Sequence, residues 1–234
     1  MARNIVFIGM PGCGKTTVSK AVAAALGLPW FDSDAEIEAA EGARITEIFA
    51  RRGEEYFREV ETACIRRLMS HAGAGMRADS DMCADSDASM GASADANAGA
   101  NANMGAGANT GVVIAVGGGA VLRNAMLLRK NATVVYLKRS VELIRATLAL
   151  RHAGENTGNG GGNDGEGGND GKSGSGGEND GGGTRPLLRD SESLTRLYRE
   201  RRALYEAACD FAVTNETSVA NAVTEVLRRI RPER

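Results

Sequence analysis

The stretch "GMPGCGKTT", residues Gly9 to Thr17, decides the fold class of this chain. It matches the pattern G-x-x-x-x-G-K-[ST] of a P-loop, whose glycines let backbone N–H groups converge on phosphate oxygens. A β-rich run, Asn4–Ile8, whose last four residues are apolar, precedes it, and an Ala-rich segment, Lys15–Leu26, follows, so the motif has the strand and the helix that it requires. In this context a chance match is the weaker interpretation, and we predict a nucleotide-binding loop.

The motif also predicts roles for its own residues. The Lys15 ammonium reaches the outer phosphates of a nucleotide, and the Thr16 hydroxyl is placed to bind Mg²⁺. The P-loop alone does not say which reaction the nucleotide serves. The residues expected to contact ATP here are Gly12, Cys13, Gly14, Lys15, Thr16 and Thr17.

Short β-rich runs alternate with longer helical patterns along the chain, which predicts a parallel sheet with helices on both faces. We therefore expect a three-layer α/β fold of the P-loop NTPase class, like that of the nucleoside monophosphate kinases, with five parallel strands. The predicted strands are residues 4–8, 29–32, 112–116, 133–137 and 210–214, and the predicted helices are residues 15–26, 54–69, 140–151, 191 or 193 to 208, and 218–230.

Two stretches, residues 73–110 and 153–184, have compositions that cannot bury enough apolar surface to fold. The first is nearly all Ala, Gly, Asn, Asp, Ser and Met, and the second holds fifteen of the 31 glycines. Without them about 164 residues remain, the size of one ordinary domain. We predict a single domain over residues 1–234, interrupted by two low-complexity insertions.

The charge of the chain is divided between these parts. The formal net charge is −2, but the two insertions hold eleven acidic and two basic residues, so the remainder carries about +7. A basic core of this size suits anionic small molecules. Nucleic acid is the competing interpretation, but no basic run is interleaved with aromatic residues, so we expect no nucleic-acid partner.

Cysteine usage and hydropathy indicate the compartment. Cys13, Cys64, Cys83 and Cys209 form no C-x-x-C pair and no regular disulfide framework, which is typical of a reducing environment. The N-terminal apolar run is too short for a signal peptide, and no later segment reaches the length of a membrane span. We expect a cytoplasmic protein with no membrane partner.

Five segments downstream of the P-loop narrow the choice of reaction, and in this order they resemble the shikimate kinases. Taken alone, each has a plainer interpretation: Asp32 or Ser33 could cap a helix, and Arg58, Arg199 and Arg202 could be solvated surface charges. Besides the P-loop the segments are "FDSD" (31–34), "GEEYFREVE" (53–61), "VVIAVGGGAV" (112–121), "RPLL" (185–188) and "RERRALYEAACDFAVT" (199–214).

The resemblance implies a role for each segment. Asp32 helps to hold the magnesium shell near the reacting hydroxyl, Asp34 binds substrate hydroxyls, and Arg58 and Arg201 bind the substrate carboxylate. The glycine triplet lines the shikimate pocket through Gly117, Gly118 and Gly119, with Gly118 as the direct contact. Arg185 closes the lid over ATP and contacts the phosphates as a catalytic residue beside Lys15 and Asp32.

One residue departs from the family pattern, and the two insertions fall at different places in it. Val116 stands where the family usually has Thr or Ser, which removes a hydroxyl from the expected site. Insertion 153–184 falls inside the lid, so it interrupts one functional loop. Insertion 73–110 should emerge at the amino edge of the sheet, with no catalytic role.

The resemblance implies ATP-dependent phosphorylation of the 3-hydroxyl of shikimate, with Mg²⁺ as cofactor, ATP and shikimate as ligands, and a monomeric enzyme. Two alternatives stay open. Another hydroxy-acid kinase such as a gluconate kinase would not need both "GGG" and "RPLL", and a nucleotide-binding regulatory protein that has lost catalysis would not need all the charged residues. The adenine contacts are not marked, and Arg145 or Arg151 could stack on the base.

Overall fold

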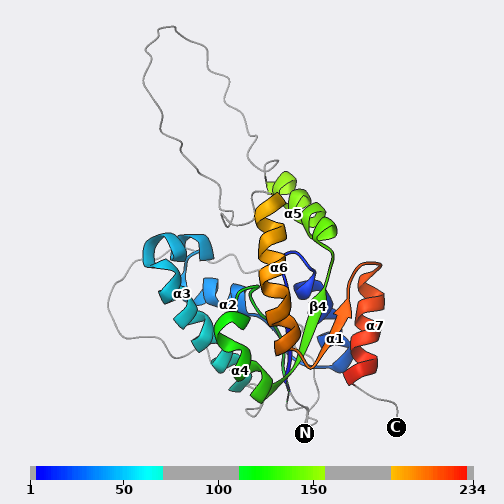
Figure 1. Cartoon of the computed structure of the whole chain (residues 1–234). Coiled ribbons are helices and arrows are strands. Elements are labelled where there is room, and N and C mark those ends of the chain that lie inside the picture. The colour runs from blue at the N-terminus through cyan, green and yellow to red at the C-terminus, as the bar shows by residue number, and fades with distance from the viewer. Residues whose placement is uncertain (1–3, 71–110, 156–190, 231–234) are drawn as a thin grey trace, which may run out of the picture.

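The structure is a computed structural model that describes residues 4–70, 111–155 and 191–230 (Figure 1). Its five strands form one parallel sheet in the order β2-β3-β1-β4-β5, which confirms the predicted architecture. Each predicted strand boundary is right to within one residue. The strands are β1 Asn4–Ile8, β2 Trp30–Asp32, β3 Val113–Ala115, β4 Ala132–Lys138 and β5 Phe211–Thr214.

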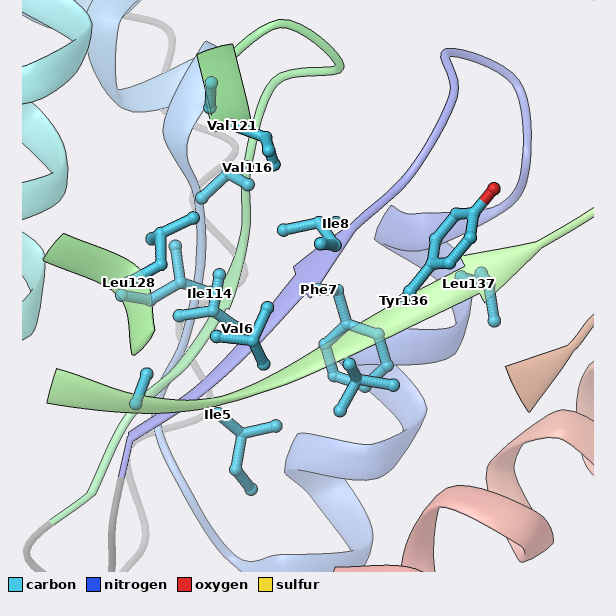
Figure 2. Close-up of a cluster of buried hydrophobic side chains, with 14 of the residues drawn as sticks. Ile5, Val6, Phe7, Ile8, Ile114, Val116, Val121, Leu128, Tyr136 and Leu137 are labelled. Carbon is cyan, nitrogen blue, oxygen red and sulfur yellow. The ribbon is translucent and has the colours of Figure 1, made fainter. Parts of the chain in front are cut away.

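Strand β1 lies at the centre of the sheet and is buried on both faces. It pairs with β3 on one side and β4 on the other, and all five of its residues are buried. Figure 2 shows the alternation of its side chains: Ile5 lies on one side, and Val6 and Ile8 lie on the side of Val121 and Leu128. A central strand covered on both faces explains why Ile5–Ile8 is a continuous apolar run rather than an alternating one.

The helices cover both faces of this sheet. Helix α1 packs against α7 and α4 against α6, and Figure 1 shows the two pairs on either side of β4. In the described ranges no helix is both long and apolar enough to cross a membrane. The helices are α1 Lys15–Leu26, α2 Ser33–Glu41, α3 Ile45–Ser70, α4 Val121–Asn131, α5 Val141–Glu155, α6 Ser191–Ala208 and α7 Val219–Ile230.

Three helical segments were not predicted from the sequence: α2, the first part of α3, and α4. Helix α2 buries only Ser33 and Ile37, so it carries almost no apolar periodicity. Gly53 has φ 82° and ψ 174° and breaks α3, so the helix predicted from residue 54 is the part of α3 that follows this kink. Helix α4 has no side-chain N-cap and buries the polar Asn124 between Val121 and Leu128, which weakens its pattern.

Asn4 joins the two described ends that flank residues 71–110. Its amide nitrogen donates to the carbonyls of Met69 at 3.1 Å and Asn131 at 3.3 Å, and its amide oxygen accepts from the N–H of Val112 at 3.2 Å. These contacts lie at the amino end of β1, and the P-loop begins at the other end of that strand. The chain therefore leaves and re-enters the fold at the amino edge of the sheet, although residues 71–110 themselves are outside the described ranges.

We predict that Asn4→Ala lowers the free energy of unfolding by about 2 to 4 kcal/mol, because it leaves buried backbone groups without a partner. Urea denaturation followed by circular dichroism measures the change. Asn131→Ala is the matched control, since the Asn131 amide is exposed and bonds only within its own helix, to the Leu127 carbonyl at 2.8 Å. Equal losses in the two variants would contradict the role of Asn4.

Candidate active site

The P-loop joins β1 to α1 and is shaped by glycines at which no other residue fits. Gly9 has φ 146° and Gly14 has φ 96°, values that L residues rarely adopt. A Cβ at Gly9 would lie 2.7 Å from the carbonyl oxygen of Leu137, and one at Gly14 would lie 2.5 Å from Nδ2 of Asn215. The glycines are therefore needed both for the backbone path and for the close approach of β4 and of the segment after β5.

Lys15 lies folded back over the loop that it terminates. Its ammonium donates to the carbonyl oxygens of Gly9 at 2.9 Å and Met10 at 3.0 Å. A phosphate oxygen would be a stronger partner than a carbonyl, since it carries the opposite charge. Cys13 is 0% exposed, so this residue can contribute only its backbone to ligand binding.

Thr16 and Asp32 meet beside the loop. The Thr16 hydroxyl donates to Oδ2 of Asp32 at 2.9 Å, so the two residues expected to hold Mg²⁺ are in direct contact. The other oxygen of Asp32 accepts from the N–H of Asp34 at 3.1 Å and caps α2. The cap interpretation of "FDSD" is therefore confirmed for Asp32, and the same carboxylate also faces the P-loop helix. A hydroxyl and a carboxylate are hard oxygen donors, which fit Mg²⁺.

The glycine triplet follows β3 and touches acidic side chains from two helices. A Cβ on Gly117 would lie 2.7 Å from Oδ1 of Asp34 and 2.9 Å from Oε1 of Glu61. The N–H of Gly117 also donates to the Ser33 hydroxyl at 3.1 Å, which fixes the start of α2 against the triplet. The absence of a side chain at Gly117 is what brings these two carboxylates to the same point.

The next two glycines contact a cation and the P-loop. A Cβ on Gly119 would lie 2.6 Å from Nη1 of Arg58, and one on Gly118 would lie 2.7 Å from Cδ of Pro11. The triplet therefore lies between the P-loop and the Arg58 guanidinium. The structure brings the predicted site residues of "FDSD", "GEEYFREVE" and "GGG" together.

Arg58 is held in place by carboxylates of its own helix. It is 8% exposed, and its guanidinium donates to Glu61 at 2.9 Å and to Glu54 at 3.0 and 3.2 Å. Burial alone would lower the pKa of Arg58, but the hydrogen bonds and charges of Glu61 and Glu54 outweigh it and raise that pKa. The plainer interpretation of Arg58 as a solvated surface charge is therefore wrong.

Helix α6 supplies two donors to the middle of the triplet. The carbonyl of Gly118 accepts from Nη1 of Arg201 at 3.0 Å and from the Tyr205 hydroxyl at 2.5 Å. Burial raises the pKa of Tyr205 to about 12, so the hydroxyl remains a donor at neutral pH. Arg202 instead pairs with Glu206 at 3.1 Å on the exposed side of the helix, where the solvated interpretation applies.

The structure adds three residues to the site that the sequence reasoning missed: Glu61, Tyr205 and Asn215. Asn215 follows β5, and its Nδ2 donates to the carbonyl of Cys13 at 2.9 Å. Glu61 lies three residues after Arg58 on a helix, a spacing that could have indicated an ion pair. Tyr205 and Asn215 gave no local signal, since their partners are distant in the chain.

The remaining predicted residues are those of the lid, the two candidates for adenine stacking, and Val116. Arg185 and the lid segment lie outside the described residues, as does the side chain of Arg151, whereas Arg145 is exposed on α5. Val116 is buried in the apolar cluster beside Val121 (Figure 2). That it removes a hydroxyl from the substrate site stays a prediction.

Comparisons with known proteins give the same family as the motifs. The family model described as shikimate kinase matches residues 11–76 and 93–154, more than half of the chain. A shikimate kinase from Cupriavidus pinatubonensis is 32% identical over 97% of this chain and 85% of its own length. One from Chromohalobacter salexigens is 33% identical over 97% of this chain and 92% of its own length.

A solved structure is similar throughout. The shikimate kinase from Acinetobacter baumannii in complex with shikimate matches with a TM-score of 0.64 and 26% identity, over 98% of this chain and 93% of that one. The P-loop, the acidic pair after β2, the glycine triplet and the two arginines facing it thus occur in a chain that matches these proteins along nearly its whole length. This chain belongs to the shikimate kinase family.

Proposed function

We propose that this protein transfers the γ-phosphoryl group of ATP to the 3-hydroxyl of shikimate, giving shikimate 3-phosphate and ADP. The observation that carries the proposal is the convergence on the glycine triplet. The P-loop reaches it through Pro11, the acidic segment after β2 through Asp34, and two helices through Arg58 and Arg201. The similar Acinetobacter enzyme is a shikimate complex, which supports shikimate as the acceptor.

The nucleotide side of the site works by positioning and by neutralising charge. Backbone N–H groups of the P-loop surround the phosphates, and Lys15 exchanges its two carbonyl partners for phosphate oxygens. Thr16 and Asp32 hold Mg²⁺, which supplies neutralisation of charge on the β- and γ-phosphates when bound. We assign Arg185 to the same task from the lid, on the motif alone.

The residues on the acceptor side of the site fit a small hydroxy acid as the substrate. A planar guanidinium binds a carboxylate through two parallel hydrogen bonds, and Arg58 and Arg201 both lie against the triplet. Asp34, which lies against Gly117 at the start of the triplet, accepts hydrogen bonds from substrate hydroxyls. Asp32 lies between the P-loop helix and Asp34, where it can orient the hydroxyl that attacks the γ-phosphorus.

The two alternatives account less well for the same contacts. A non-catalytic nucleotide-binding protein has no use for a buried guanidinium held by carboxylates beside the P-loop, since burying such groups costs free energy. A gluconate kinase would share the P-loop and an acidic acceptor site. The family match favours shikimate over gluconate.

We also propose that residues 1–234 form one domain and that both low-complexity stretches interrupt it. The single sheet supports this, because its strands come from before, between and after the two stretches. We also propose that a monomer is active. We place the enzyme in the cytoplasm, where the free thiols of Cys13, Cys64 and Cys209 stay reduced.

We predict that the full chain and a variant lacking residues 154–183 both release ADP from Mg·ATP when shikimate is added. Lengthening a flexible loop from about 10 to about 40 residues adds only about 1 kcal/mol to its closure, because the cost rises with the logarithm of length. A coupled ADP assay with shikimate, gluconate or no acceptor measures the rates. Turnover with gluconate alone, or no acceptor-dependent turnover in either chain, would contradict the proposed function.

We predict that Arg58→Lys raises the KM for shikimate by about tenfold to a hundredfold and leaves the KM for ATP almost unchanged. Lysine keeps the positive charge beside Glu61 but lacks the two-pronged guanidinium that matches a carboxylate. Steady-state kinetics with each substrate varied in turn measures both constants. Arg67→Lys, on the same helix and paired with Glu36 at 2.9 Å, is the control and should behave as wild type.

We predict that Asp32→Asn lowers kcat by about a hundredfold or more at saturating substrates and raises the Mg²⁺ concentration needed for half-maximal rate. Asparagine is as good an N-cap as aspartate, so α2 and the stability of the fold should be retained. Rates over a magnesium titration, with a thermal melt of the same sample, separate the two roles. Glu36→Gln on the same helix is the control, and a wild-type rate in Asp32→Asn would exclude Asp32 from catalysis.

A further inference from the structure

Arg139 borders the P-loop but has no part in the roles assigned above. It follows β4 and precedes α5, and its Nη1 donates to the carbonyl oxygen of Gly12 at 3.3 Å. Its Nε is buried, and none of the described residues accepts a hydrogen bond from it. Burying a guanidinium nitrogen without a partner costs free energy, so the position of this side chain calls for a reason other than stability.

Lys138, the cation next to Arg139 in the chain, differs from it in having an ion-pair partner among the described residues. Lys138 pairs with Glu206 at 3.0 Å, whereas within the described ranges no carboxylate forms an ion pair with Arg139. The charge of Arg139 therefore stays available to the P-loop. A positive charge beside this loop favours the bound state of an anionic nucleotide.

The contact with Gly12 determines where a peptide group points. In a trans peptide the C=O and the following N–H point in opposite directions. Because Arg139 holds the Gly12 carbonyl on the outside of the loop, the N–H of Cys13 faces inward, and it does point across the loop to the Met10 carbonyl at 3.3 Å. Inward N–H groups are the ones that bind phosphate.

The next peptide of the loop is held in the same way. Asn215 donates to the carbonyl of Cys13 at 2.9 Å, which turns the N–H of Gly14 toward the other side. Two consecutive peptides are thus fixed by side chains from outside the loop, one following β4 and one following β5. This is a recurring contact pattern rather than one isolated bond.

Gly12 is a position where such a constraint is needed. It has φ 77°, and glycine exchanges readily between backbone conformations, so its peptide can turn over at little cost. Apolar side chains of helix α5 also lie close to Gly12: a Cβ there would lie 3.2 Å from Leu148 and 3.5 Å from Ile144. The apolar contacts restrict where the loop lies, and Arg139 alone supplies a polar contact to the Gly12 carbonyl among the described residues.

We propose that Arg139 is a positioning residue for the nucleotide: it holds the Gly12 carbonyl outward, so that the Cys13 N–H is aimed at the phosphates before ATP arrives. This inference rests on the proposed function only in that the P-loop binds a nucleotide. Preorganisation of the loop lowers the free-energy cost of binding, so Arg139 contributes to the affinity for ATP and ADP. It does not touch the acceptor pocket, so it leaves shikimate binding unchanged.

The test compares Arg139→Met with Lys138→Met, two neighbouring substitutions that each remove one positive charge. We expect Arg139→Met to raise the dissociation constant of Mg·ADP and the KM for ATP by about tenfold, as for the loss of one charge-assisted hydrogen bond. Its kcat and its KM for shikimate should stay within about twofold of wild type, and Lys138→Met should change none of these values. Isothermal titration calorimetry with Mg·ADP and steady-state kinetics measure them.

Unchanged Mg·ADP affinity in Arg139→Met would overturn the proposal, as would an equal loss in Lys138→Met. A fall in kcat with a rise of both KM values would also overturn it, because that pattern indicates a merely structural role. If Arg139→Met does not fold, Arg139→Lys replaces it, and a rise of about threefold or more in the dissociation constant of Mg·ADP is then required. Wild type that binds Mg·ADP without phosphorylating shikimate would contradict only the proposed function.

Discussion

The contact between Gly118 and Pro11 is the constraint on which the rest of the site depends. A Cβ on Gly118 would lie 2.7 Å from Pro11, so the triplet and the P-loop touch backbone to ring. The carbonyl of Gly118 is at the same time fixed by Arg201 and Tyr205 of α6. Because both groups lie at the carboxyl ends of adjacent strands, any shift of the acceptor pocket would also move the phosphate loop. Such rigidity suits a reaction whose catalysis rests on positioning.

In this site the burial of the charged side chains matters as much as how many of them there are. Arg58 and Glu61 are nearly inaccessible, and their ion pair holds the guanidinium in one orientation against Gly119. A buried pair of this kind contributes little net stability, since desolvation offsets the attraction. Its value lies in orientation, because a carboxylate ligand finds Arg58 already aligned and does not have to order a flexible side chain.

The sequence predicted the parts of the molecule that depend on local pattern. The strand boundaries follow from the apolar runs, the end of α1 follows from Gly27, and the P-loop follows from the spacing of its motif. Helix α2 was not predicted because it buries few side chains. The roles of Tyr205, Asn215 and Arg139 were not predicted because each donates a hydrogen bond to a carbonyl at least 80 residues away in the chain. A side chain whose partner is a distant backbone carbonyl leaves no periodicity and no motif, so only the folded chain reveals it.

The contacts that hold the chain at each edge of the sheet account for where it accommodates extra residues. At the amino edge Asn4 ties Met69 of α3 to Val112 before β3, so the path between them can lengthen without moving either element. At the carboxyl edge the P-loop, the triplet, α6 and the segment after β5 are bonded to one another, and an added residue within these segments would displace a ligand contact. A long loop costs little entropy when its ends are held by the fold, because closure depends only on the logarithm of length. The site therefore constrains sequence length within its bonded segments, and the extra residues fall between such segments: from α3 to β3 at the amino edge, and from α5 to α6 in the lid.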